Sequence, residues 1–438
     1  MDNSPKNNRT HEVWQSWSAH CAGHFSCEVA LSGGLDSVVL LHIMCALRDE
    51  YGIRIHAVHV HHGLQAAADD WVRFCTDLCA RWQVPLRIER VTVHSAGTGI
   101  ESAARQARYA AFAGSLQPVI ALAHHRDDQV ETFLLSMLRG GGVRGMSAMP
   151  PVRRLNERIC LWRPLLNVSR KQLEAYAAAY DLPFVNDPSN AETHYLRNWL
   201  RHDILPVVHK RLPAADAHIM RNIDSLQHTL RLLDEVTAAD YQAVSPQQGV
   251  LDCTAWHGLS TARRNEVLRR FAQDNHLGVA SVHSVRDFAQ HLFRQPQGHH
   301  VWHLPNGEAH AQYGRLWAWS RHDALRDGQW DINLLHWQTT AVWGLPESEN
   351  WTQSYSLRTV TPQDTLATRG GHKNVVKLLQ EKKIPAFIRR YWAVVVDKND
   401  ICRAVVNLRC DEIEGVRGGK LPCFTGFERF LTELCGKT

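Results

Sequence analysis

Short apolar segments of β-type residues recur along the first part of the chain, and segments with helical periodicity separate them. The apolar segments begin 27, 32 and 33 residues apart, and they are Cys27–Leu31, Arg54–Val60, Leu86–Val93 and Val119–Ala123. The helical segments are Ser37–Leu47, Ala67–Trp82, Glu101–Phe112 and Asp127–Leu138. Strands that alternate with helices at this spacing form βαβ units, so the pattern predicts an α/β domain built on a parallel sheet.

Polar residues follow three of these four strands at the point where each strand ends. They are Ser32–Ser37, His61-His62-Gly63 and His124–Asp128. Ligands of open parallel sheets bind outside the carboxyl ends of the strands. We therefore expect the three groups to lie at one edge of the sheet and to form the functional site.

The first of these groups combines two adjacent glycines, two serines and an aspartate. Glycine tolerates positive φ, so consecutive backbone N–H groups can converge on an anion, and the following helix directs its positive end at the same place. Asp36 would repel a phosphate, whereas a carboxylate beside a bound polyphosphate usually holds Mg²⁺. We predict that this loop, which is not a Walker A motif, binds ATP and that Asp36 is the Mg²⁺ ligand. Its residues are Ser32, Gly33, Gly34, Leu35, Asp36 and Ser37.

The other two groups offer histidines and acids. His61 could donate a hydrogen bond to a phosphate or to a base, and we include it among the ATP-binding residues. Asp128 and Glu131 share a helix face with Thr132, and Asp127 precedes them. Acids at a helix start interact favourably with the helix dipole, but this does not account for the two histidines before them. The sequence predicts a cation or substrate site here, with Asp127, Asp128 and Glu131 as catalytic candidates.

Two arginines of the segment Glu101–Phe112 add positive charge. Glu101, Arg105 and Arg108 recur at i, i+4 and i+7 and therefore share one helix face. The pattern is typical of a Glu–Arg pair on a helix surface. It is equally typical of two guanidinium groups over a phosphate, because the arginine fork matches an oxyanion. On the second alternative Arg105 and Arg108 are catalytic candidates.

The composition excludes several classes of protein. A chain of 438 residues is too long for one ordinary domain, and 44% hydrophobic with 21% charged residues is typical of globular proteins. No run of about 18 apolar residues is present and the chain does not start with an apolar signal core, so we predict a cytoplasmic protein without a membrane span. The eleven cysteines contain no Cys-x-x-Cys pair, so we expect reduced, buried thiols.

Positive charge is concentrated at the end of the chain. The net charge is +5, and the segment from Trp351 onward has fifteen Lys and Arg against nine Asp and Glu. Basic side chains interleaved with aromatics are typical of RNA-binding surfaces, although a solvated helix face is the alternative. Earlier, a polar arginine-rich helix runs to Leu205, where we expect Pro206 to end it. The predicted RNA-binding residues are Arg197, Arg201, Lys373, Lys377, Lys382, Lys383, Arg389 and Arg390.

Taken in order, these motifs resemble a known family. The loop Ser32–Ser37 matches the SGGxDS signature of the PP-loop ATP pyrophosphatases. Within that superfamily, the segments after it are similar to those of the bacterial tRNA(Ile)-lysidine synthetases. These segments are His61–Leu64, Glu101–Arg105 with Arg108-Tyr109, His124–Thr132, Leu138–Gly140, Arg163–Leu166, Asp187–Asn190 and Arg197-Asn198. The C-terminal part is similar to the end of that family in a looser way.

The resemblance implies a fold, a reaction and partners. The expected fold is an N-terminal α/β PP-loop nucleotide-binding domain (1–214), a mainly helical middle domain (215–325), a linker (326–350) and a small basic α+β domain for tRNA binding (351–438). The implied enzyme uses ATP and Mg²⁺ to adenylate the wobble cytidine of isoleucine tRNA with anticodon CAU. Free L-lysine then displaces AMP to give lysidine, which changes the codon and amino-acid identity of the tRNA. Formation of a homodimer stays open.

Three alternatives are weighed against this prediction. A PP-loop tRNA thiolase would use cysteines near the site, often as Cys-x-x-Cys, and none lies in the candidate loops. A small-molecule amidoligase of the same superfamily is disfavoured by the basic C-terminal segment. An RNA-binding protein with an inactive nucleotide site is disfavoured by the intact loop and the acidic helix start.

Overall fold

The computed structural model describes residues 5–63, 68–92, 100–186, 196–328, 330–347 and 351–431, without the side chains of residues 5–8, Ile100 and Glu101. The chain forms two compact units, Met1–Leu232 and Leu233–Thr438. The domain boundaries expected from the sequence stay predictions. Among the described helices, none has the length and the apolar character needed to cross a membrane.

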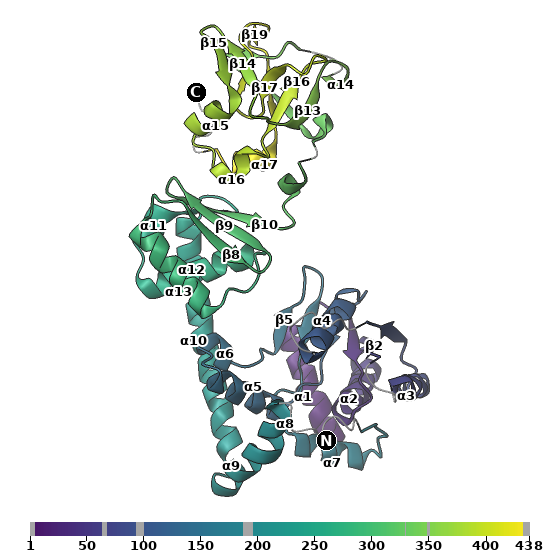
Figure 1. Ribbon diagram of the computed structural model, residues 1–438. Coiled ribbons are helices and arrows are strands. Elements are labelled where there is room, and N and C mark those ends of the chain that lie inside the picture. Colours follow the sequence, from purple (N-terminus) through teal and green to yellow (C-terminus); the bar gives the residue numbers. More distant parts are fainter. Residues whose placement is uncertain are drawn as a thin grey trace. The chain divides into compact units, whose positions relative to one another are not determined.

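The first unit is built on a six-stranded sheet in the order β3-β2-β1-β4-β6-β5. Figure 1 labels two of these strands, β2 and β5. Four parallel strands confirm the sequence prediction, and they are β1 (Ser26–Ala30), β2 (Arg54–His61), β3 (Leu86–Arg90) and β4 (Val119–Ala121). β6 (Cys160–Trp162) extends the parallel pairing beyond β4, and β5 (Val152–Arg154) pairs antiparallel with β6. The sequence pattern did not reveal β5 and β6.

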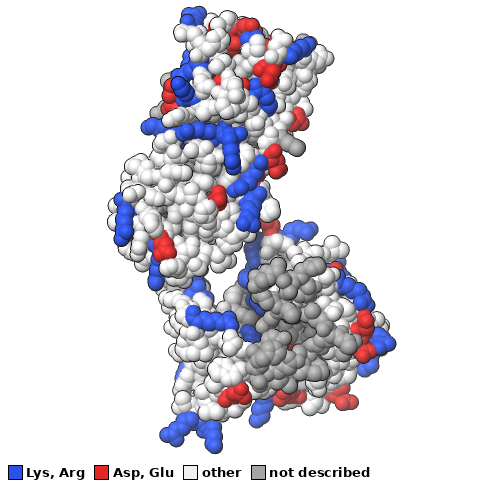
Figure 2. Space-filling view, viewed as in Figure 1, with Lys and Arg blue, Asp and Glu red and all other residues white. Residues whose placement is uncertain are grey.

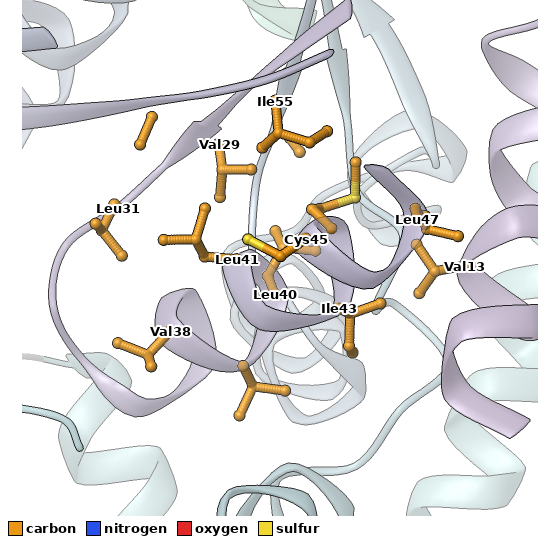
Figure 3. Packing of buried hydrophobic residues seen from close by; sticks show 14 of the residues in the cluster. Val13, Val29, Leu31, Val38, Leu40, Leu41, Ile43, Cys45, Leu47 and Ile55 are labelled. Carbon is orange, nitrogen blue, oxygen red and sulfur yellow. The ribbon is translucent and has the colours of Figure 1, made fainter. Parts of the chain in front are cut away.

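The four expected helices follow their strands. They are α2 (Leu35–Tyr51), α3 (Ala68–Arg81), α4 (Ile100–Ala113) and α5 (Arg126–Leu138). α2 contacts the sheet, α1 (Pro5–His20) and α7 (Arg170–Ala179), and it is therefore buried on nearly all sides. Figure 3 shows part of this core, where Leu40, Leu41 and Ile43 of α2 pack with Val29 and Ile55 of the sheet. The mostly polar α1 and the four-residue α6 (Val143–Met146) were not predicted.

The arginine-rich helix after residue 195 departs from its expected shape. α8 (Leu196–Trp199) passes through a π-helical turn (Leu200–Ile204) into α9 (Leu205–Arg211). The prediction that Pro206 ends a helix is wrong, because Pro206 lies in the first turn of α9. Proline is tolerated there, since the first N–H groups of a helix have no acceptor within it. α10 (Ala215–Val244) then runs from the first unit into the second.

The second unit starts with helices that pack on an antiparallel sheet. The helices are α11 (Cys253–His257), α12 (Thr261–Asp274) and α13 (Val282–Arg294). The sheet has the order β7-β10-β9-β8, with β7 (Val250–Asp252), β8 (His300–Leu304), β9 (Gly307–Gln312) and β10 (Arg315–Ser320). The helices and the strands share one core, which includes Trp256, Phe271 and Leu316.

The C-terminal part of the second unit is rich in short strands. Its four-stranded sheet consists of β13 (Ser356–Thr359), β16 (Ala393–Val396), β17 (Cys402–Val405) and β18 (Arg409–Cys410). A hairpin of β14 (Thr365–Thr368) and β15 (Gly371–Asn374) leads into α15 (Val375–Glu381), and α14 (Trp351–Ser354), α16 (Ala386–Arg389) and α17 (Thr425–Glu428) complete the helices. The range 326–350, expected as a linker, also forms strands. β11 (His336–Thr339) and β12 (Trp343–Gly344) pair with β20 (Lys420–Cys423) and β19 (Val416–Arg417).

The two parts of the second unit are joined by a common core. Trp317 and Trp319 of β10 pack in one cluster with Trp392, Phe427 and Phe430 of the C-terminal part. The indole N–H of Trp317 also donates to the backbone oxygen of Arg429 at 3.0 Å. The C-terminal part is therefore held to the preceding sheet by buried aromatic packing.

Leu41→Ala tests the core beneath the loop that follows β1. Leu41 is fully buried in α2, so the substitution leaves a cavity, and we expect a loss of about 2–5 kcal/mol in the free energy of unfolding. Chemical denaturation of the full chain measures the shift. Leu116→Ala is the matched control, because Leu116 is 89% exposed and should change stability by less than about 0.5 kcal/mol. Equal effects of the two variants would contradict this account of the core.

Candidate active site

The loop after β1 is folded around the hydroxyl group of Ser37. This hydroxyl donates to the backbone oxygen of Gly34 at 2.8 Å, lies 3.0 Å from the Ser32 hydroxyl and accepts the backbone N–H of Ser32 at 3.2 Å. Gly33 has φ 89°, as expected for an anion-binding turn, and a Cβ there would also lie 3.0 Å from Val185. The loop is thus held in shape by its own side chains.

The loop residues differ in what they can offer a ligand. Ser32 is exposed, whereas Ser37 and Leu35 are buried, so their side chains support the turn and the core. Gly34 has an extended conformation (φ −71°, ψ 159°) and caps the start of α2. The positive end of this 17-residue helix therefore faces the loop, as an anion site requires.

Asp36 lies in the first turn of α2 and is bound by an arginine that the sequence did not single out. Nη1 of Arg170 lies 2.7 Å from Oδ1 and 2.6 Å from Oδ2 of Asp36. Nε of the same guanidinium donates to Glu174 at 3.0 Å. Burial raises the pKa of Asp36, and the nearby His125 and Arg170 oppose that shift. The only sequence sign of Arg170 is its place after Ser169, the residue that caps α7.

The start of α5 gathers three carboxylates around a buried histidine. Nε2 of His125 lies 3.8 Å from Asp36 and 3.6 Å from Asp128, and Nδ1 lies 3.8 Å from Asp127. Asp128 also accepts the backbone N–H of His125 at 3.0 Å, which caps the helix. Although burial acts to raise the pKa of Asp128, His125 and His124 bring it below its ordinary value. The expected meeting of the β1 and β4 groups at one edge is therefore observed.

Glu131 is fully buried and is held by two arginines. Arg201 donates to its two oxygens, from Nε at 2.7 Å and from Nη2 at 3.1 Å, and Nε of Arg197 lies 3.4 Å away. Burial raises the pKa of Glu131, and Arg201 opposes that shift. Arg197 and Arg201 were assigned to RNA binding, and the structure pairs them with this acid. Their role toward RNA stays a prediction.

The remaining predicted site residues are two histidines at the end of β2 and two arginines of α4. His61 lies at the end of β2, with Nε2 3.4 Å from Asp69. Burial and the nearby Arg108 lower the pKa of His62 to about 4. Arg105 and Arg108 share α4, and Arg105 donates to the Tyr109 hydroxyl at 3.1 Å. Their predicted partner Glu101 lies outside the described side chains, and so do Leu64 and the segment Asp187–Asn190.

The basic residues of the C-terminal part fall into two groups. Lys377, Lys382, Lys383 and Arg390 are exposed. Lys373 forms an ion pair with Glu381, and Arg389 donates to the backbone of Ile384 and to the Tyr313 hydroxyl, so these two also support the local structure. Figure 2 shows Lys and Arg side chains exposed on the second unit.

The residues of this site could bind Mg²⁺ only together with oxygen ligands that a substrate supplies. Within the described part of the chain no group of three His, Cys, Asp or Glu is arranged to hold a metal ion. Mg²⁺ in nucleotide sites is commonly bound by one or two carboxylates together with substrate phosphates and water. Asp36 and Asp128 supply carboxylates of this kind, and both lie near Nε2 of His125. Arg170 occupies both oxygens of Asp36, so a cation there would have to displace it.

Fold and site together define a class, namely the α/β nucleotide-binding enzymes with a phosphate loop between the first strand and its helix. Residues 6–208 match the family model of the PP-loop domain, and residues 251–317 match that of the TilS substrate binding domain. A tRNA(Ile)-lysidine synthase of Neisseria gonorrhoeae is 41% identical over 411 residues, which cover 91% of this chain and 92% of the relative. That of Chromobacterium violaceum is 37% identical over 93% of this chain and 97% of its own. This chain belongs to the tRNA(Ile)-lysidine synthase family.

A solved structure of the U34-tRNA thiolase NcsA from Methanococcus maripaludis, with its [4Fe-4S] cluster, is also similar. It is 15% identical, has a TM-score of 0.43 and covers 51% of this chain and 80% of its own.

The pH dependence of stability tests the burial of His62. Its pKa is about 4 in the folded chain and about 6.5 in an unfolded one, so below about pH 6.5 protons bind the unfolded state preferentially. The folded state should lose stability progressively as the pH falls from about 6.5 to about 4. His62→Gln removes this contribution, so its thermal unfolding midpoint should fall less than that of the native chain between about pH 7 and pH 5. Exposed His322→Gln is the control, and parallel curves for all three proteins would contradict the assignment.

Proposed function

We propose that this chain ligates lysine to the 2-carbon of the wobble cytidine of isoleucine tRNA with anticodon CAU, at the expense of ATP. The observation that carries the proposal is the parallel pairing of β1 with β4, which sets the Ser32–Ser37 loop beside the acidic start of α5. A ligation of this kind needs an activated phosphate and carboxylates that hold an amine at the same place. The family supplies the identity of the substrate, and we place the reaction in the cytoplasm.

In the first step the 2-oxygen of the cytidine attacks the α-phosphorus of ATP, and pyrophosphate leaves. The positive end of α2, where the loop turns into the helix, holds the leaving group, because it presents a fixed positive dipole to it. Arg105 and Arg108 on α4 stabilise charge that builds on the α-phosphate. Mg²⁺, when bound at Asp36, would neutralise the polyphosphate. Arg170 would then release Asp36 and keep its contact with Glu174.

In the second step the ε-amino nitrogen of lysine attacks C2, the bond from C2 to the adenylated oxygen breaks, and AMP leaves. A carboxylate must take the proton that the amine loses. The side chains of Asp127 and Asp128 are 34% and 14% exposed, whereas both oxygens of Glu131 are held by Arg201. We therefore assign the lysine amine to Asp127 and Asp128 and treat Glu131 as the residue that positions Arg201.

A tRNA thiolase is the second candidate, and the chemistry of Cys75 argues against it. The Cys75 sulfur lies 3.3 Å from the position that a Cβ on Gly33 would take, directly beside the phosphate loop. Burial raises the pKa of this thiol to about 12, so it stays protonated near neutral pH. Sulfur transfer needs a thiolate, which this environment does not favour.

Incorporation of labelled lysine into a CAU-anticodon isoleucine tRNA tests the proposal. We expect ATP-dependent incorporation with release of pyrophosphate. Asp36→Ala should lower the rate by at least about a hundredfold, the loss typical of removing one group that stabilises developing charge. Asp49→Asn on the same helix is the matched control, because its side chain is 68% exposed and pairs with Arg48. Sulfur transfer in place of lysine incorporation would refute the assignment, and full activity of Asp36→Ala would refute its role.

The salt dependence of tRNA binding tests the exposed basic residues. Replacing Lys377, Lys382 and Lys383 together by Gln should lower the slope of log K against log salt by about 2, because each phosphate contact contributes about 0.7–0.9. Substitution is preferable to truncation, since deleting the C-terminal part would uncover Trp317 and Trp319. Exposed Lys398→Gln serves as the control. An unchanged slope in the triple variant would remove these lysines from the tRNA interface.

A further inference from the structure

Three arginines lie around Tyr109 at one edge of the first unit's sheet. Two of them, Arg153 and Arg163, have no role in the proposed reaction. Arg105 and Tyr109 belong to α4, Arg153 belongs to β5, and Arg163 directly follows β6. β6 runs parallel to β4, with Ala121 opposite Trp162. Arg163 therefore lies at the same edge as His124, one strand farther from the phosphate loop. We call these four residues the Tyr109 cluster.

One tyrosine brings the three like charges together. Nη2 of Arg105 donates to the Tyr109 hydroxyl at 3.1 Å, and its guanidinium carbon lies 5.0 Å from the centre of the ring. The guanidinium carbon of Arg153 lies 5.2 Å from the same centre. Arg163 interacts electrostatically with Tyr109 and Arg153, and its Nη1 donates to the backbone oxygen of Pro150 at 2.9 Å. The aromatic ring and the hydroxyl group thus fix the positions of the guanidinium groups.

The positive charge of the cluster is not balanced within the described part of the chain. There, none of the three guanidinium groups forms an ion pair with Asp or Glu. Arg163 is only 3% exposed, and its buried Nε has no hydrogen-bond partner. Burial lowers the pKa of Arg163, and the neighbouring Arg153 acts in the same direction. Buried charge is normally paired, so this arrangement calls for an anion from outside the chain.

We propose that Arg153 and Arg163 of the Tyr109 cluster bind a backbone phosphate of the RNA substrate beside the nucleotide that is modified. The identity of the RNA rests on the proposed function. Neighbouring strands lie about 4.8 Å apart, so two strand spacings, about 10 Å, separate the ends of β1 and β6. The acids of α5 follow β4, between these ends. ATP, the reacting base and the RNA backbone thereby take successive positions along one edge.

The chemistry of the cluster fits a phosphodiester. Its charges are guanidinium groups, which present pairs of N–H donors to the two free oxygens of such a phosphate. Arg153 is exposed and can meet a chain that arrives from solvent, whereas Arg163 is buried and already in position. Contacts of this kind fix the register of a nucleic acid without reading its sequence.

The test measures binding of a fluorescently labelled anticodon stem–loop RNA to the full chain by anisotropy, without ATP. Arg153→Gln should raise Kd about five- to tenfold and lower the salt slope by about 0.7, the contribution of one single-strand phosphate contact. Arg154→Gln is the matched control, because Arg154 is the exposed next residue of the same strand. We expect it to leave both quantities unchanged. Thermal unfolding verifies that each variant is folded, and Tyr109→Phe should weaken RNA binding as well.

Calorimetry of ATP binding distinguishes a cluster that binds a phosphate of the RNA from one that binds a phosphate of ATP. Weaker RNA binding with unchanged ATP affinity in Arg153→Gln supports the proposal. Weaker ATP binding with unchanged RNA binding would assign the cluster to the nucleotide, and no change in either would leave it without a ligand. Either result overturns the proposal. An equal loss of RNA affinity and ATP affinity, together with a lower unfolding temperature, also overturns it. If lysine incorporation fails while Arg153→Gln still weakens RNA binding, the phosphate site stands and the proposed reaction falls.

Discussion

The parallel pairing of β1 with β4 is the constraint on which the site depends. Val29 lies opposite Ala121, so the two strands end side by side and release the phosphate loop and the start of α5 at the same edge. The contacts of Asp36 with Arg170 and His125 follow from this register. A slip of one residue would turn every side chain of the strand to the other face of the sheet, so the buried residues of these strands also fix the site.

Charge divides the edge into two regions. The acids that follow β1 and β4 have cationic neighbours, Arg170 for Asp36 and Arg201 for Asp128 and Glu131. The Tyr109 cluster after β6 has no such compensation within the described residues. The charge of the acidic region is therefore balanced within the chain. The basic region is suited to accept an anion.

In the second unit, packing determines which basic side chains are exposed to solvent. Its buried tryptophans pack the C-terminal strands against the preceding sheet. The exposed lysines of α15 and of the turn after it therefore lie on a part of the chain that shares a core with that sheet. Two residues of the same basic segment instead support the local structure. Lys373 forms an ion pair with Glu381, and Arg389 donates a hydrogen bond to the Tyr313 hydroxyl. Similar residues in one stretch of sequence thus serve packing and surface charge at once.

The sequence by itself determined the strands β1–β4, the helices after them and the glycine turn at Gly33, because hydrophobic period and glycine conformation are local properties. It also placed the acids of α5 at the correct edge. Only the tertiary structure decided the pairing of Asp36 with Arg170, of Glu131 with Arg201 and of Arg153 with Tyr109. These contacts join residues far apart in the chain, and they depend on strand order, register and burial, which no local pattern records.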